Sequence, residues 1–143
     1  MMGNPVVHFE ILGPDGPALS GFYRELFGWV LRDGRLPGWP HYGLLQPGET
    51  GIGGAVGTAD AAPESTVIVY VEVDDPQAYL NRAQQLGAHV VLPVTHIPEA
   101  EVTVGWLRDP QGNIVGVMKN HEAALPADPA TGRRRLAVRD DAR

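Results

Sequence analysis

The chain contains no cysteine. Disulfides, thiolate nucleophiles and cysteine-ligated zinc or iron–sulfur sites are therefore excluded. It also lacks any apolar run of the ~20 residues that a membrane helix needs, although hydrophobic residues make up 43% of the sequence. Residues 1–5 lack the basic and apolar regions of a secretory signal. We therefore expect a cytoplasmic protein with no membrane partner.

Basic residues are scarce, since 11 Lys and Arg face 17 Asp and Glu and the formal net charge is −6. This charge opposes binding to the phosphates of nucleic acid, so no nucleic-acid partner is expected. Five of the basic residues fall within residues 133–143. Such a terminal charge run predicts a flexible C-terminal tail over residues 120–143, and the other interpretation is a basic arm for an acidic partner.

The first half of the chain reads as a strand, a helix and three further strands. Residues 6–12 alternate apolar and polar side chains, which is the period of a half-buried strand. Apolar residues recur at helical spacing from Leu19 to Phe27, and Gly28 supplies a stop. Short apolar stretches separated by Gly and Pro predict three more strands, at 29–31, 41–45 and 52–56.

The second half repeats this order. Residues 67–73 alternate as the first strand does, and Pro76 and Gly87 delimit a second helix. Three more strands are predicted at 89–92, 103–107 and 114–118. The sequence therefore predicts two βαβββ modules, residues 5–57 and 66–119, that are joined by a linker at 58–65 and form one domain over residues 5–119.

The first strand of each module carries a polar face and an apolar face. The apolar face is expected to pack on that module's own helix, with Val7, Phe9 and Ile11 in the first module and Val67, Val69, Val71 and Val73 in the second. The opposite face carries the polar side chains His8, Glu10, Tyr70 and Glu72. Polar groups gathered on one face of two strands indicate a partly hydrated concavity.

Three stretches together resemble the vicinal oxygen chelate superfamily, which includes glyoxalase I, bleomycin-resistance proteins and extradiol dioxygenases. They are residues 7–11 with 22–29, residues 73–75 with 86–88, and the turn at 109–113. The resemblance spans residues 5–119. It implies an α+β fold, the glyoxalase/bleomycin resistance/dihydroxybiphenyl dioxygenase fold, in which two βαβββ modules form a cupped mixed sheet around a cavity, commonly as a homodimer.

The resemblance also implies a divalent-metal site with four ligands from the first and last strands of each module. His8 stands at the first ligand position, but its counterpart lies near Ile68, which cannot coordinate a metal, and Gly116 stands where glyoxalase I carries glutamate. We therefore expect neither an intact metal site nor a cofactor, because such sites need three or four converging ligands. The other interpretation is a divalent metal that His8 shares with Glu10 or Glu72.

The leading hypothesis is a metal-independent protein that binds a small aromatic or apolar organic ligand in the cupped sheet, as antibiotic-sequestering bleomycin-resistance proteins do. The candidate ligand-binding side chains are polar or aromatic, namely His8, Glu10, Trp39, Tyr42, Tyr70, Glu72 and Trp106. A second hypothesis is a lyase, isomerase or dioxygenase that uses His8 with the two glutamates in metal-dependent or acid–base chemistry. A third is a dimeric scaffold. The shape of the pocket depends on segments 33–41 and 93–102, which read as loops.

Overall fold

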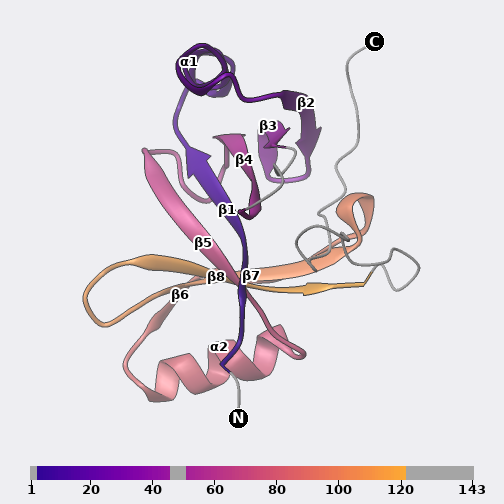
Figure 1. The fold of residues 1–143 in the computed structure, drawn as a ribbon. Helices are drawn as coiled ribbons and strands as arrows, with labels where there is room; N and C mark the ends of the chain where they lie inside the picture. Colours follow the sequence, from indigo (N-terminus) through magenta and orange to yellow (C-terminus); the bar gives the residue numbers. More distant parts are fainter. Residues whose placement is uncertain (1–2, 46–50, 122–143) are drawn as a thin grey trace.

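Two βαβββ modules follow one another in the computed structural model, which describes residues 3–45 and 51–121 (Figure 1). The first consists of β1 (Val6–Leu12), α1 (Gly16–Phe27), β2 (Leu31–Leu36), β3 (Trp39–Leu45) and β4 (Gly53–Thr58). The second consists of β5 (Thr66–Glu72), α2 (Pro76–Gln85), β6 (His89–Ile97), the short 3-10 helix η1 (Pro98–Ala100), β7 (Val102–Arg108) and β8 (Ile114–Asn120). The duplicated α+β architecture predicted from the sequence is confirmed.

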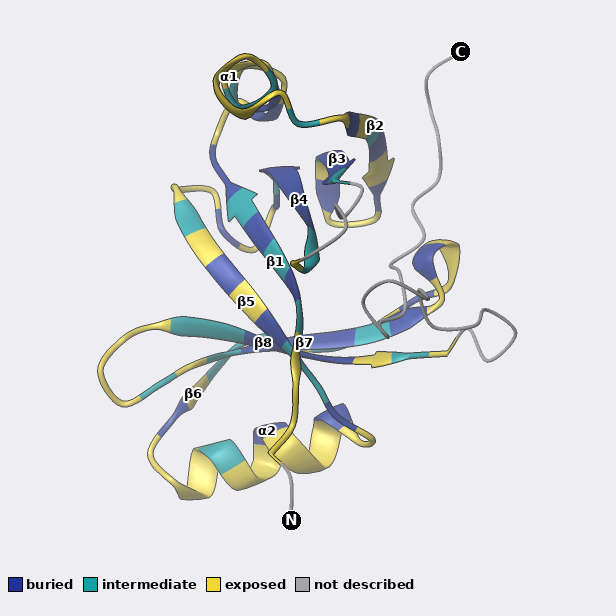
Figure 2. Cartoon of the chain, in the orientation of Figure 1, coloured by how far each residue is buried: buried dark blue, intermediate teal, exposed yellow. Residues whose placement is uncertain are grey.

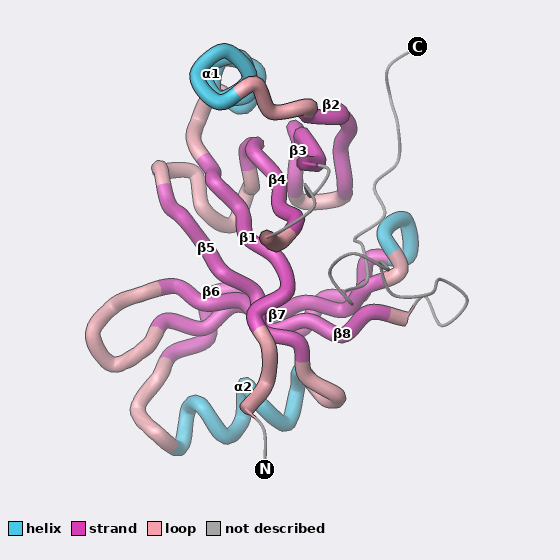
Figure 3. Tube along the Cα trace, in the orientation of Figure 1, coloured by secondary structure: helices cyan, strands magenta, loops and turns pink. Residues whose placement is uncertain are grey.

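All eight strands belong to one mixed sheet with the order β2-β3-β4-β1-β5-β8-β7-β6. The modules meet at its centre, where β1 and β5 run antiparallel and Glu10 is the register partner of Ile68. Each of these strands has its own module's last strand as a parallel neighbour on the other side. The sheet curls into a cup, with one helix outside each half (Figure 3).

The two helices begin in the same way. The side chains of Asp15 and Asp75 each accept a hydrogen bond, 3.1 Å long, from a backbone N–H of the first helical turn, and a proline follows in each first turn. Helix α1 ends at Gly28, whose φ of 66° lies in the left-handed region that favours glycine. The helix limits expected at Gly28 and Pro76 are therefore confirmed.

Three segments differ from the sequence prediction. The strand expected at 29–31 begins only at Leu31, and the ring of Trp29 before it packs against Phe9 and Tyr23. Segment 33–41 is a hairpin of β2 and β3 rather than a loop, and segment 93–102 is largely strand because β6 runs on to Ile97. Pro93 is accommodated where the β6–β7 register shifts, so that its missing N–H disrupts no regular ladder.

Neither of the two described α-helices packs mainly on the outer face of the central strands β1 and β5. Helix α1 packs on β3 and β4, whereas α2 packs on β6, β7 and β8. The expected contact with α2 is therefore wrong for Val67 and Val69, which are 63% and 39% exposed. It is confirmed for Val71 and Val73, which pack in one cluster with Leu80 of α2. Figure 2 shows the resulting alternation of exposed and buried bands along β5.

The main core fills the concave face of the sheet. Tyr42, Ile68 and Trp106 have no exposed surface and belong to one cluster that both modules build. A smaller cluster of Val73, Leu80 and Val117 lies between α2 and the sheet. Burial of each such side chain contributes about 1.5–3 kcal/mol.

Two further expectations concern the C-terminal tail and membrane-spanning helices. Strand β8 includes residue 120, where the tail was expected to begin, and the tail from 122 onward lies outside the described residues. Among the described helices, none has the length and apolar composition needed to cross a membrane.

Candidate functional site

A buried polar cluster occupies the centre of the concave face. On β1, His8 and Glu10 alternate inward and are only 4% and 2% exposed. The antiparallel neighbour β5 contributes Tyr70, the register partner of His8. Strand β3 contributes Tyr42 and Trp39 from the other side. Five of the seven side chains proposed from the sequence therefore line one small cavity.

The carboxyl group of Glu10 is the hub of this cluster. Its Oε1 accepts a hydrogen bond from Tyr70 Oη at 2.7 Å and its Oε2 accepts one from Tyr42 Oη at 2.7 Å. The indole Nε1 of Trp39 donates a longer bond of 3.4 Å to Oε1. Every one of these donors is uncharged, so the carboxylate is held by hydroxyl and indole dipoles rather than by a cation.

Two further bonds extend the network outward. Trp106 Nε1 donates to Tyr70 Oη at 2.8 Å, and His8 Nε2 lies 2.7 Å from Tyr42 Oη. Because the Tyr42 hydroxyl proton is directed to Glu10, its oxygen accepts from His8, which assigns the Nε2–H tautomer to His8. Two chains of hydrogen bonds thus converge on one carboxylate.

Burial shifts the ionisation of the whole cluster. It raises the pKa of Glu10 to about 7, although the bonds from Tyr42, Tyr70 and Trp39 act in the opposite direction. Burial also lowers the pKa of His8 to about 3. At neutral pH His8 is therefore an uncharged ring, while Glu10 is divided between its ionised and protonated forms. A carboxyl group poised near neutrality is typical of functional sites.

The cavity beside Glu10 is small, about 10 Å³. Apolar side chains enclose it, with Leu36 on β2, Ile97 on β6 and Met118 on β8 among them. A space of this size holds one water molecule at most. The sequence predicted a partly hydrated concavity. That prediction is wrong for this conformation, because aromatic and aliphatic side chains fill the cup. An organic ligand enters only if part of this wall moves.

Two of the proposed residues lie outside the cavity wall. Trp106 is buried and makes no hydrogen bond to Glu10 itself; it donates to the Tyr70 hydroxyl and contacts the ring of Trp39, both of which donate to Glu10. Glu72 is half-buried near the end of β5, and its backbone pairs with the segment before β1. The wall residues that sequence reasoning missed, such as Leu36 and Met118, are apolar, and nothing in the sequence distinguishes them from ordinary core residues.

The donor set does not fit a four-ligand metal site. A Cβ atom on Gly116 would lie about 2.5 Å from the Tyr70 ring, so this ring fills the space into which a ligand side chain from β8 would project. On β4 the register partner of His8 is Gly53. Within residues 3–45 and 51–121, no three His, Asp or Glu side chains are grouped to hold a metal ion.

A serine, a histidine and an aspartate also meet beneath α1, but they do not form a catalytic triad. His41 Nε2 lies 3.0 Å from Ser20 Oγ and 3.4 Å from Asp33 Oδ1, so a single ring nitrogen faces both partners. A triad needs the serine and the aspartate on different nitrogens. Ser20 is also fully buried. This cluster joins α1 to β2 and β3 and has a structural role.

Comparison with known families agrees with this architecture. The family model described as a glyoxalase-like domain matches residues 9–118. The chain belongs to this family. It is thereby a member of the vicinal oxygen chelate superfamily, which confirms the resemblance seen in the sequence.

Two curated mycobacterial proteins carry the name glyoxylase, CFP32 of Mycobacterium tuberculosis and of Mycobacterium bovis. Each is 28% identical to this chain over 107 residues, which is 72% of this glyoxalase-like chain but 41% of the relative. The chain thus matches less than half the length of these relatives. Activities of the whole relatives therefore do not transfer directly.

Solved structures share the fold. A methylmalonyl-CoA epimerase in complex with methylmalonyl-CoA has a TM-score of 0.62 at 15% identity, over 83% of this chain and 96% of that one. The methylmalonyl-CoA epimerase of M. tuberculosis gives 0.61 at 14% identity, over 84% and 93%. The protein BH1468 from Bacillus halodurans gives 0.59 at 18% identity, over 87% and 99%. At these identities the likeness establishes the fold alone.

Proposed function

We propose that this glyoxalase-like protein binds a small organic molecule on the concave face of its sheet, without a metal, and that Glu10 anchors the ligand. The observation that carries the proposal is the buried Glu10 carboxyl group, which only uncharged donors hold. Near neutral pH such a group both accepts a hydrogen bond when ionised and donates one when protonated. It therefore suits a hydroxyl, amine or carbonyl group on an otherwise apolar ligand.

In this proposal the ligand enters the cavity beside Glu10 when the β2–β3 hairpin moves. β2 is an edge strand of the sheet, and the hairpin carries Leu36 and Trp39 over the cavity. The Trp39 bond to Glu10, at 3.4 Å, is longer than both 2.7 Å tyrosine bonds and is the weakest of the three. Outward movement of Trp39 releases one acceptor position of Glu10 and opens a space that aromatic walls line. A flat aromatic ligand then replaces the indole with little loss of packing.

A thermal-shift screen with aromatic natural products tests the proposal. A ligand at about 100 times its Kd stabilises the folded state by about 2.7 kcal/mol. We expect Glu10→Gln to bind any hit more weakly, while the matched variant Glu72→Gln binds it as the wild type does. Equal stabilisation of the wild type and Glu10→Gln would place the ligand elsewhere and overturn the proposal.

The raised pKa of Glu10 also favours a second candidate function, proton transfer to and from an acidic C–H bond of the ligand. In this role Glu10 removes the proton and returns it, which isomerises the ligand without a redox change. Methylmalonyl-CoA, the ligand named in a structural relative, is one probe. Deuterium entering this probe from D2O faster with the wild type than with Glu10→Gln would support an isomerase. Equal rates would leave binding as the function.

We further propose that a second copy of the chain covers the outer face of the sheet. The ring of Phe9 contacts Trp29, which stacks on Tyr23, and Tyr23 contacts Phe22 on α1. Phe9 is also the register partner of Val69 on β5. These contacts join α1 and the centre of the sheet into one apolar surface, here called the outer apolar face.

The area of this face suits a dimer. Phe22, Leu26, Phe27, Val30 and Val67 are each more than half exposed. Large apolar side chains at such exposure leave on the order of 100 Å² each, so these five side chains offer about 500 Å². A stable interface buries about 800 Å² per partner. One copy of this face therefore supplies most of what a symmetric dimer needs.

A further inference from the structure

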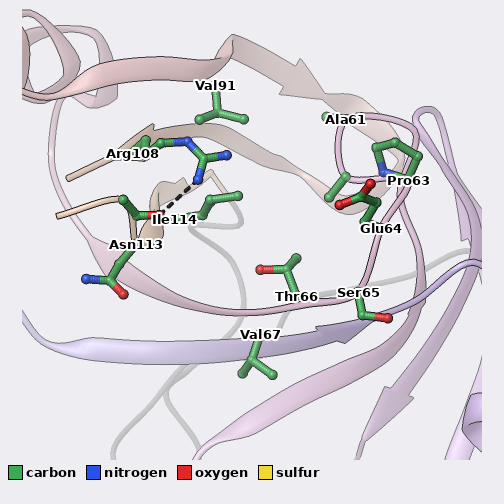
Figure 4. A pocket seen from close by; sticks show the side chains of 12 residues that line it. Ala61, Pro63, Glu64, Ser65, Thr66, Val67, Val91, Arg108, Asn113 and Ile114 are labelled. Carbon is green, nitrogen blue, oxygen red and sulfur yellow. Dashed lines mark hydrogen bonds between the residues drawn. The ribbon is translucent and has the colours of Figure 1, made fainter. Parts of the chain in front are cut away.

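A second, larger cavity lies away from Glu10, where β5 and β8 diverge beside the linker that joins the two modules. Its volume is about 440 Å³, within the range of small-molecule sites. Its lining shares no residue with the cavity beside Glu10. Figure 4 shows it as a cup whose walls come from the linker, from β5 and from the β7–β8 turn.

The first charged group on this wall is Arg108, at the end of β7. Its Nη1 donates a hydrogen bond of 2.9 Å to the carbonyl oxygen of Gly112 across the turn, and Figure 4 shows the guanidinium directed into the cup. An arginine has five N–H donors, and this bond uses one of them. Arg108 is exposed, and the bond to Gly112 favours the orientation in which the guanidinium faces the cup, which lowers the entropic cost of holding an anion.

The turn that carries Arg108 is itself held by hydrogen bonds. The Asp109 carboxylate accepts bonds of 2.8 Å from the backbone of Gln111 and of 3.0 Å from the backbone of Asn113. It accepts a third, of 2.8 Å, from the Asn113 side chain, and these bonds lower the pKa of Asp109. The carboxylate next to Arg108 in the sequence is thus engaged with the turn and does not occupy the cup.

The second charged group is Glu64, on the linker at the opposite wall, and Figure 4 shows its carboxylate facing the cup. The linker is held locally, since Ala62 N donates to the carbonyl oxygen of Ala59 at 3.1 Å and Ala62 is buried. Both side chains are exposed, and among the described residues Glu64 and Arg108 form no salt bridge with each other, so more than 4 Å separates the carboxylate oxygens from the guanidinium nitrogens. Thr66, Val91 and Ile114 line the cup as well.

We propose that this cavity is a binding site for a small zwitterion, whose carboxylate pairs with Arg108 and whose ammonium group pairs with Glu64. Two opposite charges on facing walls, with an intervening space, match a molecule that carries both charges on a short aliphatic chain. Val91 and Ile114 then contact the chain, and the Thr66 hydroxyl is available to either end. The site is independent of the proposed role of Glu10.

Calorimetric titration of the full chain with γ-aminobutyrate, δ-aminopentanoate and ε-aminohexanoate tests this proposal. Pentanoate and pentylamine, which carry one charge each, are the matched ligands. We expect saturable binding of at least one amino acid and weaker binding of both single-charge compounds. Arg108→Gln is expected to weaken binding by about tenfold or more, because it removes a charged hydrogen-bonding partner. Glu64→Gln is expected to remove the advantage over pentanoate.

Two control variants complete the experiment. Arg82→Gln alters an exposed arginine of α2, outside the cup, and is expected to bind as the wild type does. Glu10→Gln is expected to bind normally too, because its cavity is separate. Absence of saturable binding by every amino acid, or equal affinity of Arg108→Gln and the wild type, would overturn the proposal. Loss of binding in Glu10→Gln would overturn it as well and assign the ligand to the concave site.

Discussion

Tyr70 and Gly116 are register partners on β5 and β8, and the tyrosine ring lies over the glycine so closely that no side chain fits between them. The packing of the Tyr70 ring explains why glycine stands at position 116, where the resemblance implied a metal ligand. The ring also places the Tyr70 hydroxyl against Glu10. The position at which the resemblance implied a metal ligand thus supports a hydrogen-bond donor in this protein.

Gly116→Ala is expected to destabilise the fold by about 1–3 kcal/mol, because the new Cβ overlaps the buried Tyr70 ring. Gly21→Ala is the control, since a Cβ at this position on α1 meets no atom within 4 Å. That change is expected to stabilise the chain by about 0.5–1 kcal/mol. Urea unfolding measures both. Equal stabilities of Gly116→Ala and the wild type would mean that Tyr70 does not pack on Gly116.

The pH dependence of stability is expected to contain two opposed contributions. Folding raises the pKa of Glu10 from 4.5 to about 7, so the folded state binds the proton more tightly than the unfolded chain does. This contribution to stability is fully present below pH 4.5, and about 3 kcal/mol is lost as the pH rises to about 7. His8 acts oppositely, because its pKa falls from 6.5 to about 3 and protonation favours the unfolded chain. Its contribution is full above pH 6.5 and is lost as the pH falls towards 3.

Glu10→Gln separates the two contributions. Without the Glu10 proton, the free energy of unfolding is expected to rise steadily between pH 3 and 6.5, as the His8 contribution alone requires. In the wild type the two slopes oppose each other between pH 4.5 and 6.5. Urea unfolding at a series of pH values measures both curves. Parallel curves would show that Glu10 titrates normally in the folded protein.

Removal of the Tyr70 hydroxyl is expected to lower the free energy of unfolding. Tyr70→Phe takes one donor from Glu10 and leaves the buried Trp106 N–H without its acceptor. The expected loss of stability is about 1–3 kcal/mol, and the pKa of Glu10 is expected to rise further. Tyr79→Phe, which loses an exposed bond of 3.3 Å to Asn4, is expected to change stability by less than about 0.5 kcal/mol. Denaturant unfolding and the infrared carboxyl band of Glu10 provide the measurements.

Dimerisation through the outer apolar face is tested by Phe27→Glu, which introduces a charge among exposed aromatic and aliphatic side chains of α1. We expect the wild type to sediment as a dimer and this variant to sediment as a monomer. Leu86→Glu is the control, because Leu86 is 63% exposed but follows α2 in the other module. A wild type that remains monomeric at high concentration would contradict the assembly.

The sequence predicted the fold in most of its detail, because strand alternation, helix caps and the repeated order are local signals. Gly28 ends α1 and Pro76 begins α2, as the sequence predicted, whereas the N-cap Asp15 and the start of α1 at Gly16 were not predicted. The alternation of apolar and polar residues also predicted that His8, Glu10 and Tyr70 share one face of the sheet. It did not predict that Tyr42 bonds Glu10, because 32 residues separate them and only the curl of the sheet makes them neighbours.

Two other features were beyond prediction for the same reason. Leu36 and Met118 close the cup, but their apolar character suits any core position. Arg108 and Glu64 face one cavity only because the linker returns past the β7–β8 turn. Both arrangements depend on the placement of segments far apart in the chain, which no local pattern encodes.

The two hydrogen-bond chains that meet at Glu10 differ in whether they can reverse. Trp106 only donates, so the Tyr70 proton stays directed at Glu10. His8 can accept, so a proton arriving on the Glu10 oxygen that faces Tyr42 can turn the Tyr42 hydroxyl towards His8 and move the ring proton of His8 to Nδ1. The tautomer of His8 would then depend on whether Glu10 is protonated, with no change in the charge of His8. The ¹⁵N resonances of the His8 ring would report this change of tautomer.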